Sequence, residues 1–387
     1  MSRRLLITIP YFPPDPKAGG AEMFAMSTAE GLTADHGWEV TIVTTTSKDH
    51  VEIETGPTGV AVYRLPYKFT LSNSPISMSW PRELKRVIEA VDPDVIKINI
   101  PVPGLGDIAI QAAGRRPLVI YYHFGPMKKG RPVLDTLIWL YESLILPLGL
   151  RRANHIVCGS TYVRDGILFR FGSKTSIITP GVDTVRFHPA AQRVAKPRVL
   201  YVGSLNRSDQ HKRFSDLLEA CAILREDVPD LGLCAVGGGD GRGIYEDMAA
   251  RLGIADLVRF TGRLSGESLA EAYRDAAVFA LPSTREAFGM VVTEAMASGL
   301  PVVAVNGGGV TSVLDEDKNC LLVPAHNPHA LANALKTILT NPDKADAMGR
   351  AGREKVSELL VWKHQIASIN KVLITAAGLP SNDEVSP

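Results

Sequence analysis

The 387-residue sequence has few of the features that mark secreted, membrane-spanning or polyanion-binding proteins. Its four cysteines, Cys158, Cys221, Cys234 and Cys320, form no CxxC pair, which predicts reduced core thiols rather than disulfides. A formal net charge of +1 gives no sign of a nucleic-acid partner. With 45% hydrophobic and 21% charged residues, the composition is that of a globular protein long enough for two domains.

Long hydrophobic runs are also scarce. The first ten residues contain a five-residue apolar run, too short for a signal peptide. In the longest candidate, Val133–Leu150, the residues Asp135, Glu142 and Pro147 argue against a membrane span. We therefore expect a cytoplasmic protein. Residues 1–190 have a net charge of +4 and the remaining residues one of −3. The apolar run together with the basic stretch 128–131 leaves a peripheral membrane contact open. A helix packed in the first domain beside a surface loop is the favoured interpretation.

Apolar runs alternate with helical patterns along the whole chain. This order predicts an α/β fold made of two doubly wound, parallel-sheet, Rossmann-like domains. The polar, proline-containing stretch Phe187–Lys196 marks the expected boundary, with domains at 1–190 and 197–360. In open parallel sheets, ligands bind beyond the carboxyl ends of the strands, so the functional residues should lie in the loops that follow them.

The segment 286–312, EAFGMVVTEAMASGLPVVAVNGGGVTS, is the most informative part of the chain. The pattern predicts a helix over Phe288–Ala297, whose unpaired N–H groups near Gly289 would suit a phosphate. Glu286 precedes that helix and Glu294 lies eight residues further on, roughly 80° away around the helix axis. The two carboxylates can therefore flank one ligand at different depths.

Glu286-Ala-Phe-Gly and the E-x7-E spacing resemble the donor-site signature of retaining glycosyltransferases of family 4. The resemblance implies a GT-B fold, in which the two domains face each other across a cleft and a final helix, here about 361–380, crosses back to the first domain. It also implies transfer of a sugar from a UDP- or GDP-linked donor to a hydroxyl acceptor. Phe288, Gly289, Met290 and Val291 become donor-binding candidates, Glu286 would bind sugar hydroxyls, and Glu294 would bind the ribose diol.

Other loops carry the same resemblance. Gly19, Gly20 and Glu22 match the family's P-P-x-x-G-G-x-E motif, which lies over the donor and shapes the acceptor side. In RVLYVGSLNRSDQHK, Gly203 is followed by Arg207 and Lys212, which would neutralise the diphosphate leaving group. The family usually has arginine directly after this glycine, where this chain has Ser204, so Arg207 would reach in from further along the loop.

The remaining site candidates follow from neighbouring strands. Val258–Gly262 resembles the family's turn before the residues that contact the base, which makes Arg263 and Leu264 base-edge candidates. His123 ends an apolar strand; such a histidine is usually a packed core residue, but the resemblance implies contact with the donor sugar. Gly181-Val182-Asp183 resembles a family motif for which a packing role and a ligand contact are equally open.

No cofactor or metal is indicated. The glycine stretch Gly237–Gly243 does not fit GxGxxG, and no histidine or cysteine group has zinc-like spacing. Asp92–Asp94 and Asp315–Asp317 are acidic stretches in turn-like surroundings. The resemblance implies that His123, Arg207, Lys212 and Glu286 carry catalysis, mainly by stabilising charge on the departing diphosphate, with the phosphate itself taking the acceptor proton.

Three alternatives share this architecture. A nucleotide-sugar 2-epimerase would convert the donor without an acceptor. A non-catalytic nucleotide-sugar-binding protein would bind without turnover, but the presence of Arg207, Lys212 and Glu286 argues against it. A nicotinamide oxidoreductase would need the missing glycine fingerprint. The sequence leaves open the acceptor, the donor sugar and the oligomeric state.

Overall fold

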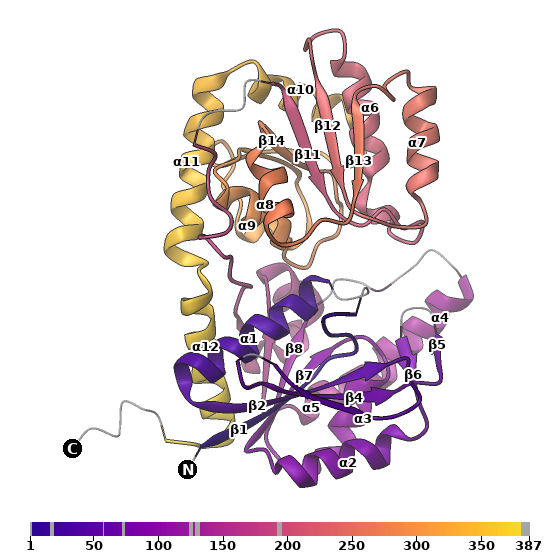
Figure 1. Ribbon diagram of the computed structural model, residues 1–387, viewed down its shortest axis with the longest axis vertical. Coiled ribbons are helices and arrows are strands. Elements are labelled where there is room, and N and C mark those ends of the chain that lie inside the picture. The colour runs from indigo at the N-terminus through magenta and orange to yellow at the C-terminus, as the bar shows by residue number, and fades with distance from the viewer. Residues whose placement is uncertain are drawn as a thin grey trace, which may run out of the picture. The chain divides into compact units, whose positions relative to one another are not determined.

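The computed structural model describes residues 2–15, 19–56, 58–71, 74–123, 127, 132–191 and 196–380. The chain divides into two compact units, one formed by residues 1–181 with 362–387 and the other by residues 182–361. Each unit is built on its own parallel sheet with helices on both faces (Figure 1). The α/β architecture therefore agrees with the prediction from the alternating pattern.

The first unit contains a sheet with strand order β10-β9-β8-β7-β1-β2-β4-β3. Strand β3 runs antiparallel to β4, and the other described pairings in this sheet are parallel. A short antiparallel pair, β5-β6, stands apart from it. The strands are β1 (Arg3–Thr8), β2 (Trp38–Thr46), β3 (Glu52–Thr55), β4 (Ala61–Pro66), β5 (Phe69–Leu71), β6 (Ser74–Ile76), β7 (Val95–Ile100), β8 (Leu118–Tyr122), β9 (His155–Cys158) and β10 (Thr175–Ile177).

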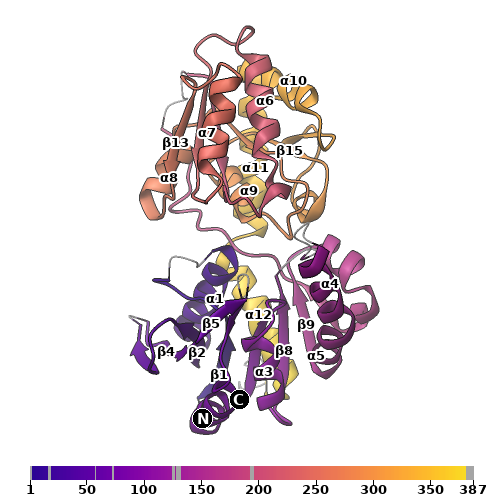
Figure 2. The ribbon, with the colours of Figure 1, turned by 90° about the vertical axis from the view of Figure 1, so that its right-hand side faces the viewer.

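Helices cover both faces of this first sheet. Helices α1 and α12 pack on one face around a core that includes Phe24, Leu32 and Leu373, and α3 packs against β1 and β7 on the other (Figure 2). The helical elements are α1 (Gly20–His36), α2 (Trp80–Val91), α3 (Leu105–Ala112), α4 (Pro132–Leu140), η1 (Tyr141–Ile145), α5 (Leu146–Arg152), η2 (Tyr162–Ile167), η3 (Phe169–Lys174) and α12 (Trp362–Ala377).

The second unit has the all-parallel strand order β13-β12-β11-β14-β15-β16. Helices α6, α7 and α10 share one core with the sheet, and α8 and α9 share the core on its other face. Its elements are β11 (Arg198–Val202), η4 (Gln210–Lys212), α6 (Phe214–Leu224), β12 (Gly232–Val236), α7 (Arg242–Arg251), β13 (Val258–Gly262), α8 (Gly266–Arg274), β14 (Val278–Leu281), α9 (Met290–Ala297), β15 (Val302–Val305), η5 (Gly308–Ser312), β16 (Cys320–Val323), α10 (Pro328–Leu339) and α11 (Pro342–Leu359).

The boundary differs from the predicted one, because the first unit ends at Gly181 rather than at residue 190. Phe187 is buried in the core of the second unit and stacks edge-on against Tyr273. Arg353 of α11 donates hydrogen bonds to the backbone carbonyls of Phe187 and Thr184. These contacts tie the predicted start of the linker to the second unit; residues 192–195 of that stretch lie outside the described part.

All four cysteines are buried and free, as predicted. The run Pro132–Arg152, formed by α4, η1 and α5, is helical, but much of it is exposed rather than packed. Among the described residues it is the one helical run long and apolar enough, by length and composition alone, to cross a membrane, and 22% of its most apolar stretch is buried. The basic stretch 128–131 lies outside the described residues.

Candidate functional site

The loops that follow the strands of the second sheet come together at its carboxyl edge. Strands β11 and β14 are neighbours, so the loops after them meet although they are far apart in sequence. Thr284, after β14, donates its backbone N–H to the carbonyl of His211, after β11, at 2.9 Å. Most of the predicted donor-side residues lie on these loops and on α9.

Lys212 and Glu286 form a close charged pair at this edge. Lys212 Nζ donates to Glu286 Oε1 at 2.6 Å, and both side chains are largely but not fully buried. The pair joins the loop after β11 to the segment that leads into α9. A partly buried ammonium held beside a carboxylate presents a positive and a hydrogen-bond-accepting group within one small space. The structure thus brings together two residues that the resemblance placed at the same ligand.

A glycine turn after β15 fixes the backbone of Glu286. Gly309 donates its N–H to the carbonyl of Glu286 at 2.6 Å. Gly308 has φ of +69°, and a Cβ there would lie 2.8 Å from the nitrogen of Glu286. A larger residue would therefore suffer both an unfavourable backbone conformation and a steric clash. This close approach explains the glycine at position 308.

Helix α9 begins at Met290, two residues later than predicted. Its N-cap, Gly289, has φ of +84°, and no side chain caps the helix. Phe288 is buried in the core instead of forming the first turn. Its buried side chain anchors the chain just before α9, and the first amides of the helix, including that of Val291, have no acceptor within the helix. An uncapped start of this kind suits an anion.

Glu294 lies on α9 and is held by a residue that the sequence did not single out. Tyr273 of α8 donates its hydroxyl to Glu294 Oε2 at 2.7 Å and also lies 3.2 Å from the carbonyl oxygen of Val291. Burial raises the pKa of Glu294 to about 7, against the opposing effects of this hydrogen bond and of Arg186. The carboxyl therefore changes charge near neutral pH.

Arg207 and Gly203 lie on the loop after β11, against the glycine stretch 237–243. Arg207 donates its backbone N–H to Asp240 Oδ1 at 2.8 Å, and its Nε to the Asp240 carbonyl at 3.2 Å. A Cβ at Gly237 would lie 1.8 Å from the Gly203 oxygen, so these two loops touch through backbone. This contact explains the glycine stretch as a packing feature and places Arg207 at an exposed position.

The predicted base-edge residues follow β13. Gly262 has φ of +77°, and its carbonyl accepts the N–H of Gly237, which closes the turn after the strand. Arg263 lies beside Gly238, and Leu264 packs against the core of the second unit. Both residues therefore lie at the carboxyl edge of the sheet, beside the loop that holds Arg207.

In the first unit, Gly19, Gly20 and Glu22 form the start of α1. Glu22 Oε2 accepts the backbone N–H of Gly19 at 2.8 Å, so Glu22 caps its own helix. Burial raises the pKa of Glu22, while that hydrogen bond lowers it. The preceding residues 16–18 lie outside the described part. Glu22 thus has a local capping role beside its predicted place on the acceptor side.

His123 lies at the carboxyl end of β8 and is part of a buried polar network. Its Nε2 lies 2.6 Å from Asn99 Oδ1, and Lys97 Nζ donates to the same oxygen at 3.0 Å. Burial, together with the charge of Lys97, lowers the pKa of His123 well below its ordinary value. Sequence reasoning singled out neither Lys97 nor Asn99; the available signal was two polar residues spaced two apart within the apolar strand β7.

The segment Gly181–Asp183 has a packing role. A Cβ at Gly181 would lie 2.6 Å from the Cα of Trp362. Val182 forms a bridge with Val361, and Asp183 Oδ1 accepts the backbone N–H groups of Val185 and Arg186. These contacts place residues 181–183 beside Val361 and Trp362 and give the motif a packing role.

The acidic stretches Asp92–Asp94 and Asp315–Asp317 form ion pairs with basic side chains. Asp92 pairs with Arg4 and Arg116, Asp315 pairs with Lys355, and Asp317 lies 3.8 Å from Lys344. In the described ranges, no group of three or more histidine, cysteine, aspartate and glutamate residues is placed to hold a metal ion.

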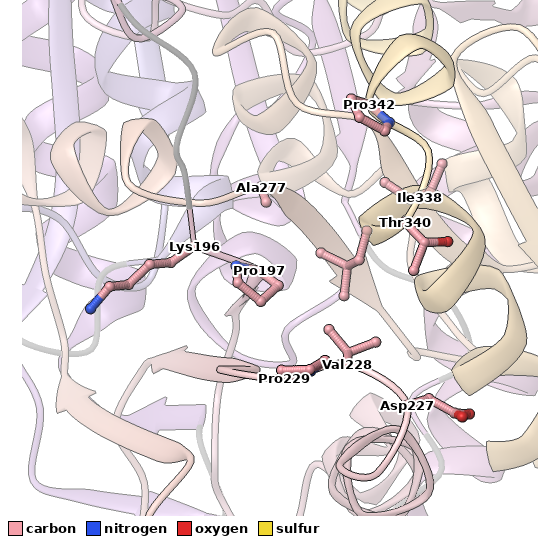
Figure 3. Close-up of a pocket in the computed structure, with 10 residues that line it drawn as sticks. Lys196, Pro197, Asp227, Val228, Pro229, Ala277, Ile338, Thr340 and Pro342 are labelled. Carbon is pink, nitrogen blue, oxygen red and sulfur yellow. The ribbon is translucent and has the colours of Figure 1, made fainter.

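A cavity of about 480 Å³ lies at the opposite edge of the second sheet. It is surrounded by residues that precede β11, β12 and β14 and by the end of α10, and Figure 3 shows Val228 and Ile338 beside it while the amine of Lys196 extends away. Ligands of open parallel sheets bind at the carboxyl ends of the strands. We therefore place the candidate site at the edge that carries Lys212 and Glu286, and not at this cavity.

Comparison with known proteins identifies both halves of the chain. Residues 18–186 match the family model described as Glycosyltransferase Family 4, and residues 187–355 match the one described as Glycosyl transferases group 1. The GDP-mannose-dependent alpha-(1-6)-phosphatidylinositol monomannoside mannosyltransferase of Mycolicibacterium smegmatis is 28% identical over 387 residues, which cover 95% of this chain and 98% of that protein.

A second relative aligns over a shorter stretch. The D-inositol 3-phosphate glycosyltransferase of Corynebacterium kroppenstedtii is 31% identical over 224 residues, 53% of this chain, so the match spans about half the length of that relative. The solved structure of sucrose-phosphate synthase from Thermosynechococcus elongatus superposes with a TM-score of 0.75 at 24% identity, over 96% of this chain and 98% of that one. The two adjoining family matches and the shared fold show that this chain belongs to glycosyltransferase family 4 and has the GT-B fold.

Proposed function

We propose that this glycosyltransferase moves a sugar from a UDP- or GDP-linked donor to a hydroxyl acceptor with retention of the anomeric configuration. The observation that carries the proposal is the Lys212–Glu286 pair, 2.6 Å apart at the carboxyl edge of the second sheet and next to the uncapped start of α9. A cation, a carboxylate and free backbone amides are the groups that a sugar diphosphate requires.

The leaving diphosphate determines the role of each charged group. As the glycosidic bond breaks, negative charge grows on the diphosphate, and a fixed cation lowers the energy of that state more than the energy of the bound donor. Lys212 supplies this charge as a point cation, and the amides of Met290 and Val291 add hydrogen bonds. Arg207 adds a second cation, a guanidinium, from the exposed loop. In this scheme side chains supply the positive charge, so the proposal includes no metal ion.

The remaining residues recognise the rest of the donor and the acceptor. Glu286 accepts hydrogen bonds from sugar hydroxyls, and Glu294 accepts both hydroxyls of the ribose, for which a carboxylate has the right pair of oxygens. Arg263 and Leu264 contact the base through their backbone. The proposal assigns to His123 a contact with the sugar, and to Gly20 and Glu22 a place on the acceptor side.

The first test is donor binding and turnover. Titration of UDP and GDP into the protein by calorimetry, followed by a panel of nucleotide sugars that begins with GDP-mannose, identifies the donor; the full-length relative is named for GDP-mannose. NMR of the product shows whether the anomeric configuration is retained. Donor converted into an epimer without any acceptor would replace the transferase by a 2-epimerase, and binding without any turnover would leave only a binding protein.

We also propose that the chain works at a membrane surface as a peripheral protein. Val133, Leu137, Leu144 and Leu148 are 51% to 78% exposed and are spread along the helical run from α4 through η1 to α5. We call this set of exposed apolar side chains the apolar stripe. Trp139, also exposed, is of a type enriched at membrane interfaces. An apolar stripe beside Arg151 and Arg152 fits a lipid surface.

Vesicle flotation tests the membrane proposal. The native chain should float with phosphatidylglycerol vesicles, and Leu137→Asp/Leu144→Asp should remain at the bottom of the gradient. The matched control, Val185→Asp/Ile244→Asp, changes two exposed apolar residues of the second unit and should float as the native chain does. Equal flotation of both variants would rule out the stripe as the lipid-binding surface.

A further inference from the structure

Lys97 is a buried lysine to which the proposed reaction gives no role. It lies in the middle of β7, is 1% exposed, and its Nζ sits over the rings of Phe24 and Tyr121 at 5.1 and 5.2 Å from their centroids. Its hydrogen bond goes to Asn99 Oδ1 at 3.0 Å. Within the described residues no carboxylate pairs with it. A buried, unpaired ammonium is costly for the fold, so its presence calls for an explanation.

Asn99 connects this lysine to His123. The Asn99 amide donates Nδ2–H to the carbonyl of Thr8 at 2.8 Å, which fixes the orientation of the amide and leaves Oδ1 as the acceptor. Lys97 Nζ and His123 Nε2 both approach that oxygen, at 3.0 and 2.6 Å. An acceptor at this distance requires His123 to carry a proton on Nε2.

The other imidazole nitrogen is therefore available to accept a hydrogen bond. Among the described residues Nδ1 has no hydrogen-bond partner, and the buried side-chain polar atoms that lack one belong to Thr8, Thr28, Glu83 and Ser357. Nothing in the described part of the chain therefore occupies Nδ1. In a neutral ring protonated on Nε2, Nδ1 carries a lone pair; in the imidazolium it carries a proton and accepts nothing.

We propose that Lys97 and Asn99 are positioning residues that keep His123 uncharged and protonated on Nε2, so that Nδ1 accepts a hydrogen bond from a hydroxyl of the substrate sugar. The inference rests on the proposed sugar transfer and names the state in which His123 takes part. Asn99 sets the tautomer through Oδ1. Burial disfavours the charged ring, and Lys97 adds to this effect, because an ammonium bound to the same oxygen repels a second proton on the ring.

The environment of His123 gives this arrangement a defined pH range. Phe24 of α1 and Tyr121 of β8 contact the ring, and burial raises the pKa of Tyr121 well above its ordinary value, so it stays neutral. Burial lowers the pKa of Lys97 to about 7. Burial and, to a smaller extent, the charge of Lys97 lower the pKa of His123. As the pH falls below 7, Lys97 takes up its proton first, and its charge then opposes protonation of the imidazole.

The experiment uses the full chain labelled with ¹³C and ¹⁵N in its histidines, without substrate. Ring shifts followed from pH 8.5 to 5.5, with the His123 signal assigned by its loss in His123→Gln, report tautomer and charge directly. The native ring should remain neutral and Nε2-protonated throughout. In Lys97→Met, which keeps the side-chain length but removes the charge, the ring should become charged at a higher pH than in the native protein. Asn99→Asp should yield an imidazolium at pH 7.

Turnover of the same variants provides the second readout. Because Lys97 is mostly neutral above pH 8, Lys97→Met should retain near-native turnover there and should lose turnover at a higher pH than the native protein as the pH falls, because only the effect of burial still lowers the pKa of His123 in the variant. The donor KM should change less than kcat. The exposed lysine of α2 supplies the matched control, since Lys85→Met removes one charge from the same unit and should leave the profile native.

The outcomes separate the two proposals. A native ring that is protonated on Nδ1 or charged at pH 7, or a Lys97→Met variant with a native ring titration and a native pH profile, overturns the assignment of Lys97 and Asn99. A native chain that transfers sugar from no nucleotide donor overturns the proposed function, whatever the ring spectra show. A neutral, Nε2-protonated ring that changes as predicted in both variants, in a chain that transfers sugar, supports both proposals.

Discussion

The two units share an architecture but place opposite kinds of groups at the carboxyl edges of their sheets. The second unit presents an ion pair, Lys212 with Glu286, 2.6 Å apart and reachable from solvent. The first unit presents neutral dipoles around His123 and buries its cation, Lys97, without a carboxylate partner among the described residues. Parallel strand order alone therefore determines where the loops meet, and the residues on the loops decide which chemistry each edge can perform.

This difference fits a division of labour in the proposed reaction. A diphosphate carries full charges that persist after the bond breaks, so fixed charges stabilise it. The hydroxyl groups of a sugar need acceptors that stay neutral, because a charged histidine would lose its lone pair. If each edge works in this way, removing the cation of the second unit should have the largest effect on turnover.

Removal of the cation should damage the second unit most. Lys212→Ala should lower turnover about 100-fold or more, the cost of losing one group that stabilises transition-state charge. Steady-state kinetics with the best donor measures this loss, and thermal melting checks the fold. Lys336 provides the control, because its pair with Asp227 at 2.9 Å lies at the opposite edge of the same sheet. Lys336→Ala should leave turnover native. Near-native turnover in a folded Lys212→Ala protein would remove Lys212 from the mechanism.

Glu294 should contribute to binding rather than to turnover. Glu294→Ala should weaken nucleotide-sugar affinity about tenfold to 100-fold through the loss of hydrogen bonds to a charged acceptor. Burial raises the pKa of this carboxyl to about 7, so the fraction present as carboxylate grows as the pH rises through 7. Calorimetric affinity of the native chain should therefore increase over that interval and stay flat in Glu294→Gln. Affinity for UDP and GDP sugars unchanged by Glu294→Ala would contradict the ribose role.

His123 should affect turnover more than affinity. His123→Ala should lower kcat about tenfold, the value of one neutral hydrogen bond that is strongest in the transition state, while donor affinity changes little. This pattern is the reverse of the one expected for Glu294, so the pair of variants tests the division between the two units. A kinetically silent His123→Ala variant would make His123 a packed core residue.

Much of the fold was predictable because most of the strands are buried. Largely apolar runs such as Arg198–Val202 and Val278–Leu281 belong to the alternating pattern of the sequence, and both form strands in the structure. The start of α9 was placed two residues early because Phe288 is apolar and matches the helical pattern, although it packs into the core before the helix begins. The boundary between the two units was placed too late in the sequence because Phe187 lies in a mainly polar stretch. Its burial depends on a tertiary contact with Tyr273.

The sequence allowed the residues of the candidate site to be predicted, but not the contacts between them. The resemblance supplied Lys212 and Glu286, yet the 2.6 Å pair follows from the adjacency of β11 and β14, which a single sequence does not reveal. Lys97 and Asn99 were missed because a short apolar strand with two polar residues can equally be a surface strand. Only the packing of α1 and α12 over that face shows that these two polar side chains are buried.

Replacement of Lys97 by methionine should have the smallest effect on function and should increase the stability of the fold. The pKa of Lys97 falls from 10.5 in the unfolded chain to about 7 in the fold, so the unfolded state binds more protons between those values. The free energy of unfolding therefore rises with pH across that interval, and the fold bears the full cost at pH 7 and below. Lys97→Met removes that cost, which is at most about 5 kcal/mol for this shift.

Thermal melts of native and Lys97→Met protein from pH 6 to 10 should show a higher Tm for the variant at low pH and convergence as the pH rises towards 10. Lys85→Met, which removes an exposed charge from the same unit, should follow the native curve. A Lys97→Met chain that is less stable than native at pH 6 would mean that the fold draws net stability from the buried ammonium. The proposed contrast is that Lys212 serves binding whereas Lys97 lowers the stability of the fold. That result would contradict it, because Lys97 would then stabilise the fold.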